Sequence, residues 1–374
     1  MAHRYQPVAE YLDLVLRELD LVGAALGRRR PVGHVHFGGG TPTMLADDDL
    51  QALGQRLHER FDLVSGAEFA VEIDPRRLTR DTATVLAAIG VNRASLGVQD
   101  LDPEVQRAIN RIQPLAVVER AVDWLRAAGI GSINLDLMYG LPQQTTARVL
   151  RSVEAVLPLR PARIALFGYA HVPWMKRHQQ LIDEASLPDA GERAAQLEAA
   201  ADRLQAAGYV AIGLDHFALP DDSLALALEQ GRLHRNFQGY TTDDAPALVG
   251  LGASAISSLP QGYVQNAVPI PHYRNALRQG RLATVRGIEV SEEDRRRRAV
   301  IERLMCDLAV DLNGYADRFS AELEALEPFA ADGLVTIDED RIWIAPAGRP
   351  LVRSVCAIFD AYLDRGAGRH SRAV

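Results

Sequence analysis

Length, composition and charge exclude several classes of protein. The chain has 374 residues, 48% hydrophobic and 24% charged, which is ordinary for globular domains and excludes collagen-like and wholly disordered chains. The formal net charge of −8 excludes the strongly basic character of proteins that bind the phosphates of nucleic acids. The sequence also contains no run of about 18 apolar residues, the length needed to span a membrane.

The N-terminus and the cysteine count bound location and metal chemistry. The first ten residues contain no apolar signal core, so we expect a cytoplasmic protein. The chain has two cysteines, Cys306 and Cys356, which are too few for a four-cysteine zinc site. Both lie among apolar neighbours, which predicts buried, unreactive thiols.

Helical and strand patterns alternate from the start of the chain. Pro7 suits the first position of a helix whose apolar face holds Val8, Leu12, Val15 and Leu19. A strand over residues 32–37 then runs into a glycine-rich segment, residues 38–42. Asp47 is expected to cap a second helix, with Leu50, Leu53, Leu57 and Phe61 on one face. A strand over residues 69–73 follows.

A repeated pattern of helix, glycine and strand predicts the fold class. Gly90, Gly129 and Gly208 each end a helical segment, and strands are expected directly after them, over residues 92–98, 132–138 and 210–214. A further strand is expected over residues 163–167. The strand spacing is near the ~31 residues per unit of a (β/α)₈ barrel, but only five or six units precede Pro220. We therefore predict an α/β fold, either a partial TIM-like barrel or an open parallel sheet, and not a closed ring of eight units.

Three domains are expected. Residues 1–220 form the barrel core, and residues 221–285, rich in glycine and proline, form a loop-rich insert or lid near the substrate site. Residues 286–374 form a small C-terminal domain of helix, hairpin and helix that resembles a winged helix. Its first helix is expected to begin with a capping box from Ser291 to Asp294.

Polar residues follow successive predicted strands. Parallel α/β folds bind ligands at the C-terminal ends of their strands, so these residues are candidates for a shared site. The glycines of residues 38–42 suit an anion nest, and Glu72 and Asp74 follow the next strand. The later strand ends carry Gln99, Asp100, Asn110, Arg111, Asn134, Asp136, residues 168–171 and residues 215–217. A role in packing explains any one of these residues, but it explains polar residues at so many successive strand ends less well.

Two short motifs indicate other chemistry. His34 and His36 would lie on one face of a strand, as in metal-dependent barrel hydrolases, but no matching ligand set stands out later in the chain. Residues 250–255 match a dinucleotide-binding fingerprint. That match lies outside any predicted βαβ unit, so a turn or the start of a helix of small residues is the better interpretation.

Ten long stretches resemble one family. They are residues 36–43, 71–76, 92–100, 105–111, 133–142, 169–173, 215–222, 233–240, 332–335 and 347–349. The chain thus resembles the oxygen-independent coproporphyrinogen III oxidases, radical S-adenosylmethionine (SAM) enzymes of haem biosynthesis. The resemblance implies that two propionates of coproporphyrinogen III lose CO₂ and become vinyl groups, giving protoporphyrinogen IX. It also implies a [4Fe–4S] cluster, two SAM molecules, a 5′-deoxyadenosyl radical and an electron donor.

The resemblance also implies site residues, although it assigns no catalytic residue. The cluster-bound SAM would be held by Gly39, Glu72 and Ile256, and the second SAM by Gly40, Thr41, Gln99, Arg111, Asp136 and Ala170. Phe237 and Gln238 would lie close to the second SAM. Basic groups expected near the four propionates of the substrate are His171, Lys176, Arg177, His234 and Arg235.

The chain departs from the family at the cluster. The family's three cysteines, spaced C-x-x-x-C-x-x-C, are absent, and residues 3–13 resemble the helix that follows them. The resemblance therefore implies a partial, open TIM-like (β/α)6 radical SAM barrel that lacks its first strand and cluster loop, and no metal ligand is expected in this chain. We favour a chain that lacks an N-terminal segment, by truncation or a misassigned start. A degenerate relative that binds SAM or porphyrin without radical chemistry is the second hypothesis. We expect the 374 residues to be inactive as given, and monomeric. A haem chaperone of the same superfamily is the other alternative.

Overall fold

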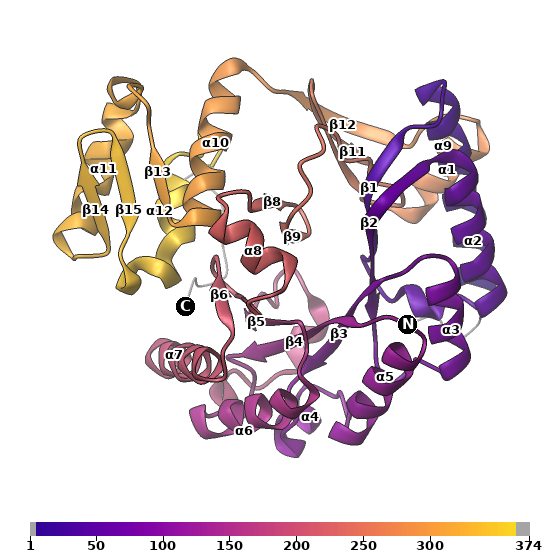
Figure 1. Ribbon diagram of the computed structural model, residues 1–374, viewed down its shortest axis with the longest axis horizontal. Helices are drawn as coiled ribbons and strands as arrows, with labels where there is room; N and C mark the ends of the chain where they lie inside the picture. The colour runs from indigo at the N-terminus through magenta and orange to yellow at the C-terminus, as the bar shows by residue number, and fades with distance from the viewer. Residues whose placement is uncertain (1–4, 364–374) are drawn as a thin grey trace. The chain divides into compact units, whose positions relative to one another are not determined.

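The computed structural model describes residues 5–363, which form two compact units (Figure 1). Within the described residues, unit 1 comprises the chain up to Gly97, Ala116–Asn134 and Asp243–Val290, and unit 2 comprises Val98–Leu115, Leu135–Thr242 and the chain from Ser291 onward. His3 and Arg4, the first residues of the family resemblance, lie outside the described residues. No helix within residues 5–363 is long and apolar enough to cross a membrane.

A seven-stranded sheet organises the first two thirds of the chain. Its strand order is β1-β2-β3-β4-β5-β7-β6. The pairs β1–β2 and β2–β3 are parallel, which confirms the predicted α/β class and open parallel sheet. The strands are β1 (Pro31–Phe37), β2 (Asp62–Ile73), β3 (Arg93–Gln99), β4 (Ser132–Tyr139), β5 (Arg163–Gly168), β6 (Val210–Ile212) and β7 (His216–Ala218).

The expected strand over residues 210–214 differs from the structure. β6 ends at Ile212, and the chain turns at Gly213, whose φ of +51° lies in the left-handed region, to return as β7. β7 pairs antiparallel with both β6 and β5, so the parallel pattern ends at β5. The short apolar run after Gly208 did not distinguish a hairpin from another parallel strand.

The helices of unit 1 are α1 (Gln6–Leu26), α2 (Asp47–Arg60), α3 (Arg80–Ala88), most of α5 (Leu115–Ala127) and α9 (Ile270–Arg278). They bury the predicted face of α2 fully, with Phe61 after it, and that of α1 in part, where Leu12 and Leu19 are buried but Val8 and Val15 are half-buried. The N-cap of α2 is Ala46 rather than the expected Asp47, because the carboxylate of Asp47 instead accepts a hydrogen bond of 2.8 Å from the hydroxyl of Thr82.

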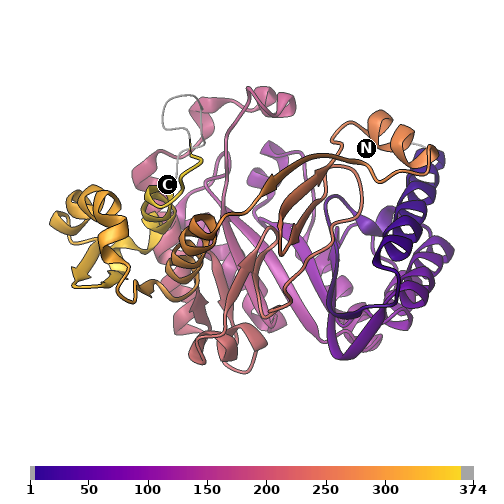
Figure 2. The same ribbon diagram turned by 90° about the horizontal axis from the view of Figure 1, so that it is seen from above.

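A second, smaller sheet belongs to unit 1. It consists of the antiparallel strands β10 (Ile256–Leu259), β11 (Gly262–Asn266) and β12 (Thr284–Glu289). Figures 1 and 2 show α9 beside α1, where Tyr273 and Leu277 pack with Leu14 in one buried cluster.

The segment expected to be loop-rich, residues 221–285, contains regular structure. Besides α9, β10, β11 and the start of β12, it forms α8 (Ser223–Glu229) and a hairpin of β8 (His234–Asn236) and β9 (Gly239–Thr241). The sequence pattern missed these elements because the strands are three to six residues long and β12 is exposed along its length.

Unit 2 contains the other helices and the C-terminal module. Before the module lie α4 (Pro103–Ala108), α6 (Thr146–Val156), α7 (Ala190–Ala206) and α8. The module, orange to yellow in Figure 1, comprises α10 (Glu292–Asp307), β13 (Ala309–Asp311), α11 (Ser320–Ala331), β14 (Val335–Asp338), β15 (Arg341–Ile344) and α12 (Val352–Ile358). The short 3₁₀ helices of unit 2 are η2 (Leu157–Leu159), η3 (Arg177–Leu181), η4 (Glu184–Ser186), η5 (Ala316–Phe319) and η6 (Pro346–Leu351), and η1 (Pro42–Met44) belongs to unit 1.

The C-terminal module has its own core. Leu304, Phe319, Leu326, Ile342 and Phe359 are almost fully buried in one cluster, under the three-stranded sheet β13-β15-β14. The predicted capping box of α10 is present, with Ser291 and Asp294 each accepting a backbone N–H hydrogen bond from the other. Helix, hairpin and helix are as predicted, with one further strand, β13.

Candidate cofactor and substrate site

The glycine-rich loop after β1 lies against Glu72. A Cβ added at Gly38 would lie 2.5 Å from Nε2 of His36 and 2.9 Å from Oε1 of Glu72, so a larger residue here would displace these two side chains. A Cβ added at Gly39 or Gly40 would meet nothing within 4 Å, and Gly39 has a φ of +76°. The loop therefore leaves open space beside its backbone amides, which suits the approach of an anionic ligand group.

The carboxylate of Glu72 is paired on one side only. It lies 3.3 Å from the imidazole of His36, and 44% of the Glu72 side chain remains exposed. Since a carboxylate accepts several hydrogen bonds, Glu72 keeps capacity for an ammonium or hydroxyl donor. Thr41 continues the loop, and its carbonyl accepts a hydrogen bond of 2.9 Å from the amide of Met44 at the end of η1.

His34 and His36 each face a carboxylate. Nδ1 of His34 lies 3.5 Å from Asp243, and His36 lies beside Glu72. Over residues 5–363, no three His, Cys, Asp or Glu side chains gather in a way that could hold a metal ion. The structure therefore offers no third ligand to complete the metal-hydrolase alternative.

Ile256 begins β10, and a buried carboxylate holds the loop before it. Glu18 of α1 accepts hydrogen bonds of 2.6 Å from the amide of Gly252, from Nδ2 of Asn266 and from the hydroxyl of Tyr273. Burial raises the pKa of Glu18 above its ordinary value, despite these donors. The amide of Gly252 is thus used within the protein, which supports the interpretation of residues 250–255 as a turn and not a dinucleotide loop.

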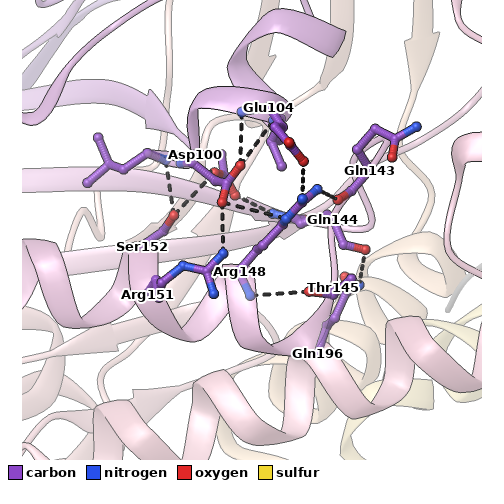
Figure 3. Close-up of polar contacts among 12 residues, drawn as sticks. Asp100, Glu104, Gln143, Gln144, Thr145, Arg148, Arg151, Ser152 and Gln196 are labelled. Atoms are coloured by element: carbon purple, nitrogen blue, oxygen red, sulfur yellow. Dashed lines mark hydrogen bonds and ion pairs between the residues drawn. The ribbon is translucent and has the colours of Figure 1, made fainter.

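In unit 2, a buried network fixes the chain at the end of β3. Gln99 takes a left-handed φ of +69°, and the next residue, Asp100, is 1% exposed. Figure 3 shows Asp100 facing Gln144 and Ser152; it accepts hydrogen bonds of 2.6 Å from Nε2 of Gln144 and 3.2 Å from the hydroxyl of Ser152. It also accepts one of 2.6 Å from the amide of Asp102. Burial raises the pKa of Asp100 in spite of these hydrogen bonds.

The network extends through three glutamines. Nε2 of Gln106 donates to the carbonyls of Asp100 (3.0 Å) and Gln113 (2.7 Å), and the amide of Arg111 donates to the carbonyl of Gln106. On the other side, Gln144 donates to the carbonyl of Met138 near the end of β4, and Gln196 of α7 donates to the carbonyl of Gln144. The segments that carry Gln99 and Arg111 are thus held by one hydrogen-bonded framework.

The remaining candidates for the second SAM fall in different places. Asp136 is a half-buried residue of β4, between the buried Leu135 and Leu137. Ala170 is exposed after β5, and its carbonyl accepts a hydrogen bond of 3.0 Å from the buried amide of Gln179. Gly40 and Thr41 belong to unit 1, and Gln99, Arg111, Asp136 and Ala170 to unit 2.

Phe237 and Gln238 form the tip of the β8–β9 hairpin. Phe237 is 57% exposed, and the amide of Gln238 donates to the side-chain oxygen of Asn236 at 2.8 Å. The two basic residues of this hairpin are occupied within the protein. His234 lies 3.0 Å from Glu302 of α10, and the guanidinium of Arg235 lies 5.3 Å from the ring centroid of Tyr240.

The other basic candidates lie on the segment between β5 and α7. His171 is held between the hydroxyl of Tyr169 (3.4 Å) and the carboxylate of Glu184 (3.2 Å). Lys176 and Arg177 are exposed, and in the described part of the chain neither has an ion-pair partner. These two residues, unlike His171 and His234, which each lie beside a carboxylate, are therefore open to an anionic ligand.

The acidic residue of the motif at residues 215–217 forms ion pairs within the protein. Asp215 lies 2.7 Å from Nδ1 of His216 and 3.5 Å from Arg353 of α12. Burial opposes ionisation, but His216, Arg353 and Arg235 together hold the pKa of Asp215 below its ordinary value. The sequence offered no signal for Arg353, because it lies 138 residues further along the chain.

The cysteines present do not fit an iron–sulfur cluster. Cys306 on α10 and Cys356 on α12 are both buried, and burial raises the pKa of each thiol to about 12. A cluster needs several thiolates in close spacing. The described residues therefore supply no ligand set for a cluster.

Comparison with known proteins identifies the family. Residues 5–156 match the model of the radical SAM superfamily, and residues 290–351 match that of the HemN C-terminal domain. The oxygen-independent coproporphyrinogen III oxidase of Bradyrhizobium diazoefficiens is 51% identical, over 98% of this chain and 83% of that protein. The enzyme of the same name from Paracoccus denitrificans is 44% identical, over 99% of this chain and 83% of that protein.

A solved structure agrees with these relatives. The structure of coproporphyrinogen III oxidase (HemN) from Escherichia coli, described as a radical SAM enzyme, superposes with a TM-score of 0.92 at 39% identity, and covers 97% of this chain and 85% of that one. The fold and the sequence thus point to the same relatives over almost the entire chain. The chain belongs to the oxygen-independent coproporphyrinogen III oxidases of the radical SAM superfamily.

Proposed function

We propose that this chain binds coproporphyrinogen III and SAM for the oxidative decarboxylation of two propionates to vinyl groups, which yields protoporphyrinogen IX. The observation that carries the proposal is the similarity to coproporphyrinogen III oxidases over 98% of the chain. The open glycine loop beside Glu72 supports it, because an amino-acid ligand presents both a carboxylate and an ammonium.

The donor set of the loop fits the methionyl part of SAM. The open side of the Gly39 and Gly40 backbone would receive the carboxylate, and the half-exposed carboxylate of Glu72 would receive the ammonium. Ile256 would complete this site. Bound SAM supplies a one-electron hydrogen abstraction in this family. Gly39, Gly40, Glu72 and Ile256 would bind and orient SAM and would transfer no proton.

We propose that Gln99, Arg111, Asp136 and Ala170 of unit 2 bind a second SAM. The amide of Gln99 and the carboxylate of Asp136 suit ribose hydroxyls or the sulfonium charge, and Arg111 suits a carboxylate. We also propose two SAM molecules in all, an electron donor and a monomeric chain, as the family resemblance implies, and a cytoplasmic location, as the lack of an apolar signal core in the first ten residues implies. Because the described residues hold no cluster ligands, we also propose that these 374 residues do not turn over coproporphyrinogen III.

Binding experiments test the proposal without catalysis. Calorimetric titration with SAM is expected to show binding, and Glu72→Gln is expected to weaken it about tenfold, which is about 1.4 kcal/mol. Glu68→Gln is the matched control, because Glu68 lies on the same strand but is paired with Arg93 at 2.8 Å. An absence of SAM binding, or equal affinity in both variants, would contradict the assignment of Glu72.

A second titration addresses the substrate. Coproporphyrin III, the stable oxidised form of the substrate with its four propionates, is expected to bind more tightly than haem, which has two. A chain that binds haem but not coproporphyrin III would instead behave as a haem chaperone. That outcome would refute the proposed function.

A further inference from the structure

The segment between β5 and α7 exposes apolar and cationic side chains together. Trp174 is 46% exposed, Met175 68% and Leu181 90%, and Lys176, Arg177 and His178 lie among them in the sequence, all exposed. We call residues 171–181 the apolar–basic loop. Exposed large apolar groups in a cluster mark a surface that a ligand or partner covers.

The apolar–basic loop is a folded structure. The side chain of Gln179 is buried, and its amide accepts a hydrogen bond of 2.6 Å from the amide of Val172 and donates one of 3.0 Å to the carbonyl of Ala170. The amides of Met175 and Lys176 both donate to the carbonyl of Val172, at 2.8 and 2.9 Å. Trp174 and Met175 are therefore presented by a tight turn closed on a buried glutamine.

The charges of the apolar–basic loop favour an anion at its tip. The acidic residues of this region, Asp183 and Glu184, follow the loop, and Glu184 is already beside His171. Among the described residues, Lys176 and Arg177 have no ion-pair partner. In a chain with a net charge of −8, this is a local positive surface beside exposed apolar groups.

Lys176 also stands out in the composition of the chain. Of the 41 Lys and Arg residues in the chain, it is the sole lysine. Arginine serves as well as lysine for a generic solvated charge, and this chain uses arginine at every other such position. A lysine differs by its compact ammonium, whose three donors adapt to a single mobile carboxylate.

We propose that the apolar–basic loop is a docking platform for the tetrapyrrole substrate, with Trp174 and Met175 against the macrocycle and Lys176 paired with a propionate carboxylate. The inference rests on the proposed function and adds to it the face that receives the ring. The occupant matches the surface, because a coproporphyrinogen combines an apolar ring with four carboxylates. Through Gln179, the platform is joined to Ala170, the residue proposed to contact the second SAM.

Because Lys176 is the sole lysine, chemical labelling reports on it directly. Reductive methylation with formaldehyde modifies its amine, and after trypsin digestion the label appears in the peptide 164–177. Coproporphyrin III at saturation is expected to lower the rate of Lys176 labelling at least fivefold, while labelling of the N-terminal amine stays unchanged. Lys176→Arg must abolish the signal, which confirms the assignment.

Two substitutions test the contacts. Trp174→Ala and Lys176→Glu are each expected to raise the Kd for coproporphyrin III about tenfold, with unchanged SAM affinity. The controls are Leu226→Ala, which removes an apolar residue that is 41% exposed on α8, and Arg318→Glu, which reverses an exposed charge in the C-terminal module. Both are expected to bind as the parent chain does.

The outcomes separate the platform from the function. Tight binding of coproporphyrin III with no protection of Lys176 would overturn the platform and leave the proposed function standing. No binding of coproporphyrin III at all would overturn both. Self-association abolished by Trp174→Ala, with no protection of Lys176 by coproporphyrin III, would make the loop a contact between copies of the chain and would also overturn the platform.

Discussion

The carboxylate of Glu18 is expected to stabilise the loop that leads to Ile256. Glu18→Ala removes the acceptor of the buried hydroxyl of Tyr273 and of the Gly252 amide, whereas Asn266 keeps its hydrogen bond of 2.9 Å to the Gly252 carbonyl. A buried donor without a partner costs about 1–3 kcal/mol, so two of them predict a loss of about 2–6 kcal/mol from the stability of unit 1.

Hydrogen exchange measured by mass spectrometry suits this prediction, because it resolves the opening of one part of a multidomain chain. Amides of residues 250–256 are expected to exchange at least about thirtyfold faster in Glu18→Ala, since 1.4 kcal/mol is a factor of ten. Glu10→Ala is the control on the same helix, because the Glu10 side chain is 47% exposed and its ion pair with Arg274, at 3.9 Å, is long and weak. Equal protection of this loop in the two variants would refute the reasoning.

Three further predictions concern buried titratable groups. Burial raises the pKa of Glu18 above its ordinary value of 4.5, so the stability that Glu18 contributes is complete below pH 4.5 and is lost as the pH rises through the raised pKa of the folded state. Urea denaturation is therefore expected to show that the parent chain loses stability relative to Glu18→Gln over this pH range. A difference that stays constant with pH would contradict this. Asp100→Ala leaves the Asp102 amide without its carboxylate acceptor, and Nε2 of Gln144 keeps its hydrogen bond to the Met138 carbonyl but loses the one to Asp100. The free energy of unfolding from urea denaturation is therefore expected to fall by about 2–4 kcal/mol, against no change for Asp221→Ala at an exposed position. Burial raises the pKa of both Cys306 and Cys356 to about 12, so a thiol-reactive dye is expected to label them only after denaturation, and rapid labelling of the folded chain at neutral pH would contradict this.

Local patterns predicted the elements whose partners are close in sequence. The apolar spacing of α2 and the glycines at the ends of the helical segments were sufficient, and Gly90, Gly129 and Gly208 indeed take φ values of +102°, +94° and +90°. Ser291 and Asp294 form their capping box because both atoms belong to one turn. In each case the interaction that fixes the element lies within a few residues.

Long-range partners were beyond the sequence. Glu18 contacts Gly252 across 234 residues, and Asp215 faces Arg353 across 138 residues; no periodicity connects these positions. For the same reason, a list of polar strand ends did not separate the carboxylates that hold the fold from those that remain open. Trp174 was missed as a site residue because exposure, which distinguishes it, is a property of the folded loop.

The remaining hydrogen-bond capacity of each carboxylate distinguishes those that hold the fold from those that can bind a ligand. Asp100 already accepts three hydrogen bonds while 1% exposed, and Asp215 is buried between His216 and Arg353, so neither has room for a ligand. Glu72 has one imidazole neighbour, is nearly half exposed and lies beside a loop with open backbone. A new donor at Glu72 displaces only water, whereas at Asp100 it would displace bonds that hold the strand end. Among these three carboxylates, Glu72 is therefore the one with free hydrogen-bond capacity, which supports the proposal that it binds SAM, and the buried pair hold the ends of their strands.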